Sequence, residues 1–208
     1  MATIAELLAS SLDALKQVQR GEDFMIIKNS DLSRTHIKRL VDNHFLKPII
    51  KGWYVVTDPR AMPGDSTAWF ASFWNFITRY ANERYGNEWC LSAEQSLSIY
   101  TGATTIPNQV LIRAPKGNDY MVSLIPPTSI FNLEAELPSK IDTNNLYNLN
   151  LYTLAEAIIV ATPTMYRNDA LTMRTALAMV HDSSDILKIL VDTGQTVRAG
   201  RVIGAFRN

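Results

Sequence analysis

The chain has few of the residues on which catalytic signatures depend. Its 208 residues include one cysteine, Cys90, so no disulfide can form within the chain. Only three histidines and nine glycines are present. The P-loop, the dinucleotide-binding pattern and the Gly-x-Ser-x-Gly turn of serine hydrolases do not occur. We therefore expect no enzyme activity and no cofactor in these residues.

Long apolar runs are also lacking. The longest stretches, such as Ala155 to Ala161, are too short to cross a bilayer and contain polar residues. The first residues, Met-Ala-Thr-Ile-Ala-Glu, lack the charged and apolar regions of a signal peptide. Together with the single cysteine, these features predict a cytoplasmic protein with no membrane role.

The chain has no net charge, because 20 Lys and Arg balance 20 Asp and Glu. This balance excludes a wholly basic nucleic-acid coat protein but is compatible with a local patch. Between Lys28 and Trp53, six basic residues face only Asp31 and Asp42. Positive charge is therefore concentrated in one short segment.

The same segment has the pattern of a helix followed by a β-hairpin. A first helix is predicted from Ile4 to near Gly21 by apolar residues at three- and four-residue steps. A second helix is predicted over Ser33 to Leu46, with Ser33 as its N-cap. The hairpin covers Lys47 to Val56, with its turn at Lys51-Gly52. We therefore predict a winged helix-turn-helix domain over residues 1–60, with this hairpin as the wing.

The remainder is predicted to be a second, α+β domain over residues 61–208. Two prolines and a glycine within residues 58–65 indicate the boundary. The domain begins with two predicted helices: an aromatic-rich helix before Gly86 and a helix from Ser92 or Ala93 to about Tyr100. A small antiparallel sheet flanked by helices follows them. The expected strands are Val110–Ala114, Tyr120–Ile125, Ser129–Leu133 and Leu146–Tyr152, and the later helices are Leu154–Ala161, Asp169–Val180 and Ser183–Leu190.

Recognition helices place N-terminal side chains against base edges, while nearby Lys and Arg neutralise phosphates. Arg34 is the best candidate base reader because its guanidinium can donate twice to guanine. Lys47 and Lys51 on the wing are expected to meet the DNA backbone. The candidate DNA-binding residues are Ser33, Arg34, Thr35, His36, Lys38, Arg39, Lys47 and Lys51. The alternative interpretation is a solvated charged helix face without DNA contact.

Other reactive or aromatic residues have structural interpretations. Cys90 has apolar neighbours and is predicted to be a core residue and not a nucleophile. Trp69, Phe73 and Trp74 belong to a helical aromatic pattern that is typical of a core. His36 and His44 lie eight residues apart on one predicted helix, so no metal site is expected.

Several motifs resemble known bacterial families. Asp31 to Leu46, followed by Ile50-Lys-Gly-Trp-Tyr, resembles the N-terminal winged helix of AbiEi-type antitoxins and related regulators. Four further segments resemble the region that precedes the catalytic domain in one group of Fic-family proteins: Asp65–Trp74, Trp89–Leu97, Arg113–Gly117 and Ala199–Asn208. The resemblance implies an antitoxin-like or regulatory module that binds DNA through its first domain and has an AbiEi-like second domain.

The chain departs from the Fic family at the catalytic loop. Fic enzymes carry His-Pro-Phe-x-x-Gly-Asn-Gly-Arg, in which the histidine takes a proton from the target hydroxyl and Gly-Asn-Gly holds nucleotide phosphates. None of His36, His44 and His181 begins such a loop, so AMP transfer cannot reside in these residues. Either the chain precedes a catalytic or toxin domain in a longer protein, which the final motif favours, or it is a stand-alone relative.

Two functions remain open. The first is a DNA-binding transcriptional regulator or antitoxin-like module that recognises an operator, palindromic if the protein forms a homodimer. The second is a protein-interaction module, in which residues 61–208 pack on a Fic-type AMP-transferring domain and restrain it without strong DNA binding.

Overall fold

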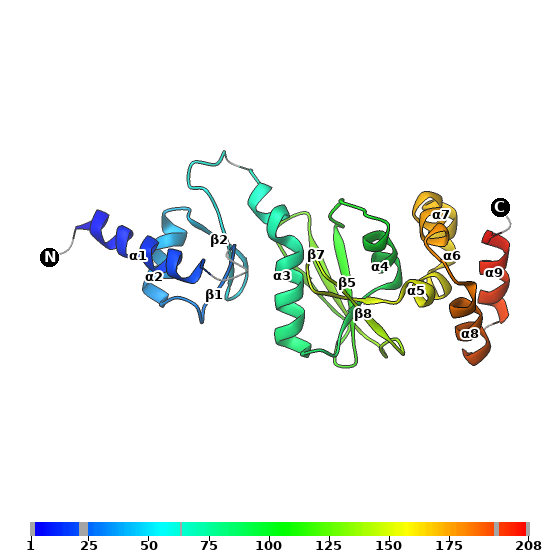
Figure 1. The fold of residues 1–208 in the computed structure, drawn as a ribbon. Coiled ribbons are helices and arrows are strands. Elements are labelled where there is room, and N and C mark those ends of the chain that lie inside the picture. The colour runs from blue at the N-terminus through cyan, green and yellow to red at the C-terminus, as the bar shows by residue number, and fades with distance from the viewer. Residues whose placement is uncertain (1–2, 21–24, 63, 194–195, 207–208) are drawn as a thin grey trace. The chain divides into compact units, whose positions relative to one another are not determined.

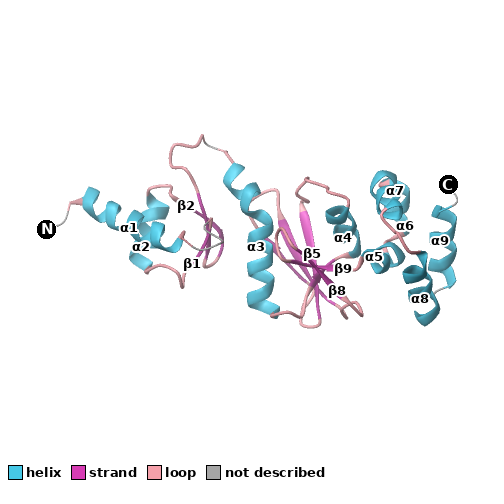
Figure 2. Ribbon diagram, in the orientation of Figure 1, coloured by secondary structure: helices cyan, strands magenta, loops and turns pink. Residues whose placement is uncertain are grey.

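Helices and small antiparallel sheets make up the computed structural model, so the α+β class is confirmed (Figures 1 and 2). The structure describes residues 3–20, 25–62, 64–193 and 196–206. No helix in these ranges is long and apolar enough to span a bilayer. The chain forms two compact units: Met1–Tyr80 with Ser123–Ser129, and Ala81–Val122 with Ile130–Asn208.

The first unit contains two helices, a three-stranded antiparallel sheet and most of a third helix. Its elements are α1 (Ile4–Val18), β1 (Ile26–Lys28), α2 (Arg34–Asp42), β2 (Leu46–Ile50), β3 (Trp53–Val56) and the first part of α3 (Thr67–Tyr85). The strand order is β1-β3-β2, and Figure 1 shows α1 and α2 side by side. Ser33 caps α2, and Gly52 turns the β2–β3 hairpin with a φ of 84°, both as predicted.

The helix predicted from Ser33 to Leu46 is shorter in the structure, where α2 is Arg34–Asp42. The chain leaves the helix at His44, whose φ of 62° is left-handed. The N–H of Phe45 donates to the carbonyl of Leu40 at 2.8 Å. This geometry is a Schellman C-cap, in which an apolar residue beyond the helix packs back on its last turn. Phe45 therefore belongs to a C-cap, and the predicted helix end is wrong.

The aromatic residues of α3 make the first unit extend past residue 60, where the sequence placed a boundary. Trp69 and Phe73 are fully buried, as their spacing predicted, whereas Trp74 is only partly buried. Phe76 meets Trp53 of β3 edge to face, with ring centroids 5.5 Å apart. Because these contacts bury large apolar surfaces, residues up to Tyr80 pack with the N-terminal elements.

The second unit combines two sheets with a group of helices. Its elements are the end of α3, β4 (Cys90–Leu91), α4 (Ala93–Tyr100), β5 (Gln109–Ala114), β6 (Tyr120–Ser123), β7 (Ser129–Glu134), β8 (Ile141–Asn144), β9 (Leu149–Tyr152), α5 (Leu154–Val160), α6 (Pro163–Asn168), α7 (Ala170–Ala178), α8 (Ser183–Thr193) and α9 (Thr196–Phe206). The strand orders are β4-β5-β7-β6 and β8-β9. Figure 2 shows α5 to α9 grouped together, and α4 contacts α5 and α7.

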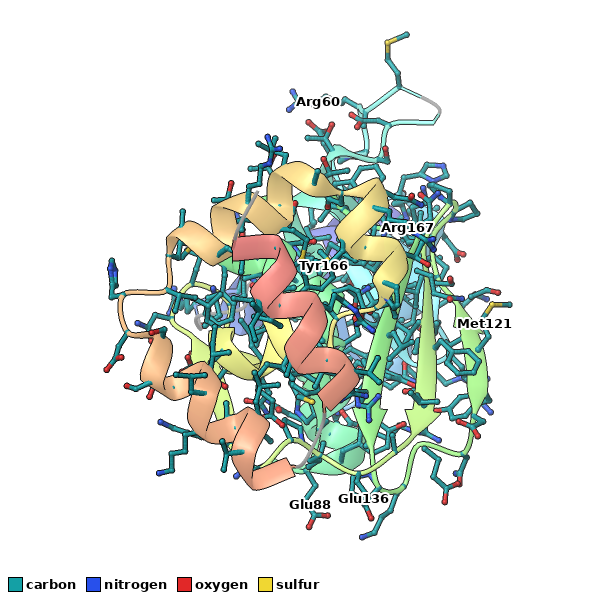
Figure 3. All side chains as sticks on the ribbon, turned by 90° about the vertical axis from the view of Figure 1, so that its right-hand side faces the viewer. Arg60, Glu88, Met121, Glu136, Tyr166 and Arg167 are labelled. Atoms are coloured by element: carbon teal, nitrogen blue, oxygen red, sulfur yellow. The ribbon has the colours of Figure 1, made fainter. Side chains whose placement is uncertain are left out.

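A polar contact ties α9 to α5 and α6 in this group. Figure 3 shows Tyr166 beside α9, the red helix in front. The guanidinium of Arg201 lies 5.7 Å from the Tyr166 ring centroid and donates to the carbonyl of Ala161 at 2.8 Å. The Tyr166 hydroxyl in turn donates to the carbonyl of Ile158 at 2.7 Å. Arg201 therefore satisfies a carbonyl at the end of α5 that the helix leaves unpaired.

The predicted elements of this unit are present, but β4, β8, α6 and α9 were not predicted. The first three are short, with two, four and six residues, whereas α9 has eleven. The strand expected over Leu146–Tyr152 begins only at Leu149. Residues before it form a turn in which Asn148 has a φ of 53°, and β8 pairs with β9 across this turn. A hairpin therefore replaces the single longer strand.

Gly117, in the loop between β5 and β6, lies close to the backbone of Leu133 in β7. An added Cβ would overlap the backbone carbonyl group of Leu133. Gly117→Ala should therefore lower the free energy of unfolding by about 3 kcal/mol or more, because backbone atoms cannot move aside as a flexible side chain can. Gly200→Ala is the control: its added methyl meets nothing within 4 Å. In α9 it should raise stability by up to about 1 kcal/mol. Urea unfolding measures both, and equal stability of Gly117→Ala and wild type would contradict the packing.

Candidate nucleic-acid interface

Helix α2 buries one side and exposes the side that carries its N-terminal charges. Ile37 and Leu40 are buried in a cluster with Leu15 of α1. Because an α-helix turns by about 100° per residue, Lys38 lies away from that buried side and Arg34 lies at its edge. Both side chains are exposed, and so is that of Thr35. Three predicted DNA contacts are thus accessible to a ligand.

A groove of about 800 Å³ lies between α2 and the β2–β3 hairpin. Its lining includes three exposed cations, Arg34, Lys38 and Lys51, and one carboxylate, Asp42. The other lining residues are Asn29, Ile37, Val41, Pro48 and Tyr54. The structure therefore brings side chains from the helix and from the hairpin turn to one concave surface with an excess of positive charge.

Lys47 is separated from this groove. It is exposed on β2 and lines a neighbouring groove of about 650 Å³, which also includes Asp58 and Asp65. The backbone N–H of Thr67 donates to Asp65 at 2.8 Å and lowers the pKa of that carboxyl, and Lys47 adds a smaller electrostatic attraction. Lys47 therefore lies among acidic side chains, in contrast to Lys51.

His36 is half-buried against α1, and its ring has a defined hydrogen-bond partner. Its Nδ1 lies 2.9 Å from Oγ of Ser11. The Ser11 hydroxyl donates its single hydrogen to the carbonyl of Leu7 at 3.0 Å. His36 is therefore held against α1 by this polar contact and is less accessible than Arg34, Thr35 and Lys38.

The remaining predicted residues have mixed positions. Ser33 is exposed, but its hydroxyl accepts from the N–H of His36 at 3.3 Å as the helix cap. Arg39 is half-buried and does not line the groove. Asn29 and Tyr54, which line the groove, were not predicted. Strand alternation could have indicated Tyr54, because it follows the buried Trp53.

No group of three or more His, Cys, Asp or Glu in the described ranges could hold a metal ion. Cys90 is fully buried, so its prediction as a core residue is confirmed. Burial raises the pKa of its thiol to about 12. The thiol is therefore protonated, and a poor nucleophile, at neutral pH.

The buried thiol should resist modification in the native protein. At pH 8, a disulfide reagent such as Ellman's should leave Cys90 intact until guanidinium unfolds the chain and exposes it. The pKa of the thiol is 9.0 ordinarily and about 12 when it is buried, so the thiol of the unfolded chain ionises first. The contribution of Cys90 to the free energy of unfolding is therefore present below pH 9.0 and is lost as the pH rises toward about 12. Rapid stoichiometric labelling of native protein at pH 8 would contradict the burial.

Compared with models of protein families and with curated proteins, this chain matches none. Its function must therefore be inferred from its own residues and their geometry.

Proposed function

We propose that this chain is a cytoplasmic DNA-binding regulator or antitoxin-like module that reads duplex DNA with α2. The first unit then acts as a winged helix-turn-helix variant, with the β2–β3 hairpin as its wing. One observation carries the proposal: exposed Arg34 and Lys38 of α2 share a concave surface with Lys51 of the hairpin turn. Helix and wing thus present complementary charge to a phosphate backbone.

The size and chemistry of α2 suit a major groove. The major groove is about 12 Å wide and admits an α-helix, whose diameter with side chains is about 10–12 Å. The nine residues of α2 are about 14 Å long at 1.5 Å per residue. Arg34 is the first residue of the helix, where recognition helices contact bases, and its guanidinium matches the two acceptors of guanine. Lys38 and Lys51 supply phosphate contacts, which fix the orientation of the protein on DNA.

The double variant Arg34→Ala plus Lys38→Ala tests the proposal. Affinity for a duplex from the region upstream of the gene should fall about 100-fold, because two contacts of about 1–3 kcal/mol each are removed. The dependence of log K on log salt should become shallower by about 1 for each phosphate contact that the substitutions remove. Fluorescence anisotropy at several salt concentrations measures both.

Arg167→Ala plus Lys188→Ala is the matched control, since it removes two exposed cations from the second unit. It should leave affinity and salt dependence nearly unchanged. A wild-type protein that binds no DNA at low salt, or equal affinities for the two double variants, would refute DNA reading by α2.

A second candidate function is protein interaction with a Fic-type domain, and a separate observation favours it. Exposed apolar side chains lie on α8 and α9: Leu187, Val191, Val197 and Ile203. Contiguous exposed apolar groups are typical of an interaction surface. Leu187 and Val191 lie one turn apart and so on the same side of α8. Such a surface would pack residues 61–208 on the catalytic domain and restrain it.

Val191→Asp plus Val197→Asp tests this candidate, since both side chains are more than three-quarters exposed. Calorimetric titration of a separately purified Fic-type domain, if one is encoded downstream, should show binding to wild type and at least about tenfold weaker binding to the variant. The variant should keep its DNA affinity. Absence of such a domain, or unchanged binding, would exclude the second candidate.

A further inference from the structure

Arg79 of α3 contacts three segments of the first unit at once. Its Nη1 donates to the carbonyl of Ile26 in β1. Its Nη2 lies 3.7 Å from Oδ2 of Asp31, in the turn before α2. Its guanidinium lies 5.6 Å from the ring centroid of Trp53, the first residue of β3. A single side chain thus connects α3 to the strand, the turn and the hairpin.

The turn that contains Asp31, which Arg79 contacts, is hydrogen-bonded to the turn of the β2–β3 hairpin. The N–H of Lys28 donates to Oδ2 of Asp31 at 2.8 Å, and the N–H of Asp31 donates back to the carbonyl of Lys28 at 3.0 Å. The N–H of Asn29 donates to the carbonyl of Gly52 at 3.0 Å. The N-cap Ser33 follows only two residues after Asp31. The start of α2 and the hairpin turn therefore share one hydrogen-bonded support.

Trp53 of the hairpin contacts both this turn and α3. It pairs in register with Lys28, whose Nζ lies 5.0 Å from its ring centroid. Its ring also meets Phe76, three residues before Arg79 and so on the same side of α3. Trp53 is 7% exposed. The hairpin is therefore held against α3 by an aromatic contact and a cation–π contact together.

We propose that Arg79 is a positioning residue for the DNA-reading surface, which sets the start of α2 and the hairpin turn in one fixed relation. This proposal rests on the proposed function. Arg34 and Lys51 must reach base edges and phosphates of one duplex together, so a shift of either segment weakens sequence-specific contact. Arg79 itself is only 26% exposed in its side chain and acts through the groups it holds.

Arginine is suited to this position in a way that lysine is not. A planar guanidinium can donate to a carbonyl and a carboxylate through separate nitrogens while its face stacks on an aromatic ring. A lysine ammonium keeps the charge but has neither the fork nor the planar face. Arg79→Lys therefore removes the geometry and preserves the charge. Arg84→Lys, on the same helix, is the matched control.

Hydrogen exchange tests the positioning without DNA. In Arg79→Lys, the amide hydrogens of Asn29, Asp31 and His36, each of which is hydrogen-bonded, should exchange about tenfold faster, because their shared support is loosened. Exchange in α1 and β2 should stay at the wild-type rate, and Arg84→Lys should change neither. Unchanged exchange at Asn29 and Asp31, or faster exchange throughout the first unit, would overturn the proposal. If Arg79→Lys does not fold, Asp31→Asn provides the same comparison with a smaller change of the cluster.

DNA binding gives the second measurement. The ratio of affinities for the upstream duplex and an unrelated duplex should fall about tenfold in Arg79→Lys, as expected when one base contact is removed. Affinity for the unrelated duplex and its salt dependence should not change, because Arg34, Lys38 and Lys51 all remain. An unchanged ratio overturns the role of Arg79 in DNA reading. If wild type binds no DNA, the proposed function fails, and exchange still decides whether Arg79 fixes the two segments.

Discussion

Trp53 is buried where strand β3 meets the aromatic side of α3, and the arrangement of the first unit depends on that burial. A three-stranded sheet with strands of three to five residues has little apolar area of its own. Phe76 supplies a large apolar partner across the sheet, and Arg79 covers the same ring with a cation. The hairpin can therefore be short and still hold a defined position.

The same construction separates the buried contacts of α2 from its exposed cations. Ile37 and Leu40 face the core with Leu15, while Arg34 and Lys38 face the groove. Substitution of the cations removes exposed side chains and leaves the buried contacts in place. For this reason, changes at the groove can report on ligand binding with little effect on folding, whereas changes at Trp53 would alter both.

Local signals explain most of what could be predicted from the sequence. Ser33 as a cap and Lys51-Gly52 as a turn depend on neighbouring residues only, and both were predicted correctly. Phe45 misled the helix assignment because its apolar spacing suits a helical turn and a Schellman cap equally. The short strand β4 and the polar strand β8 lack a periodic signal. The Arg79 contacts join residues far apart in the chain, so no local pattern could indicate them.

If α2 reads DNA as proposed, the separation of Lys47 from the groove limits how strongly one copy can bind. Lys38 and Lys51, the two groove cations proposed to contact phosphates, would give a slope of about −1.8 in log K against log salt, at about −0.9 for each phosphate. The zero net charge of the chain adds no long-range attraction. Electrostatic binding by one copy is then weak, and affinity must come from base contacts by α2 or from two copies bound to adjacent half-sites. In either case, the fixed relation between α2 and the hairpin decides how many of these side chains can reach one duplex at the same time.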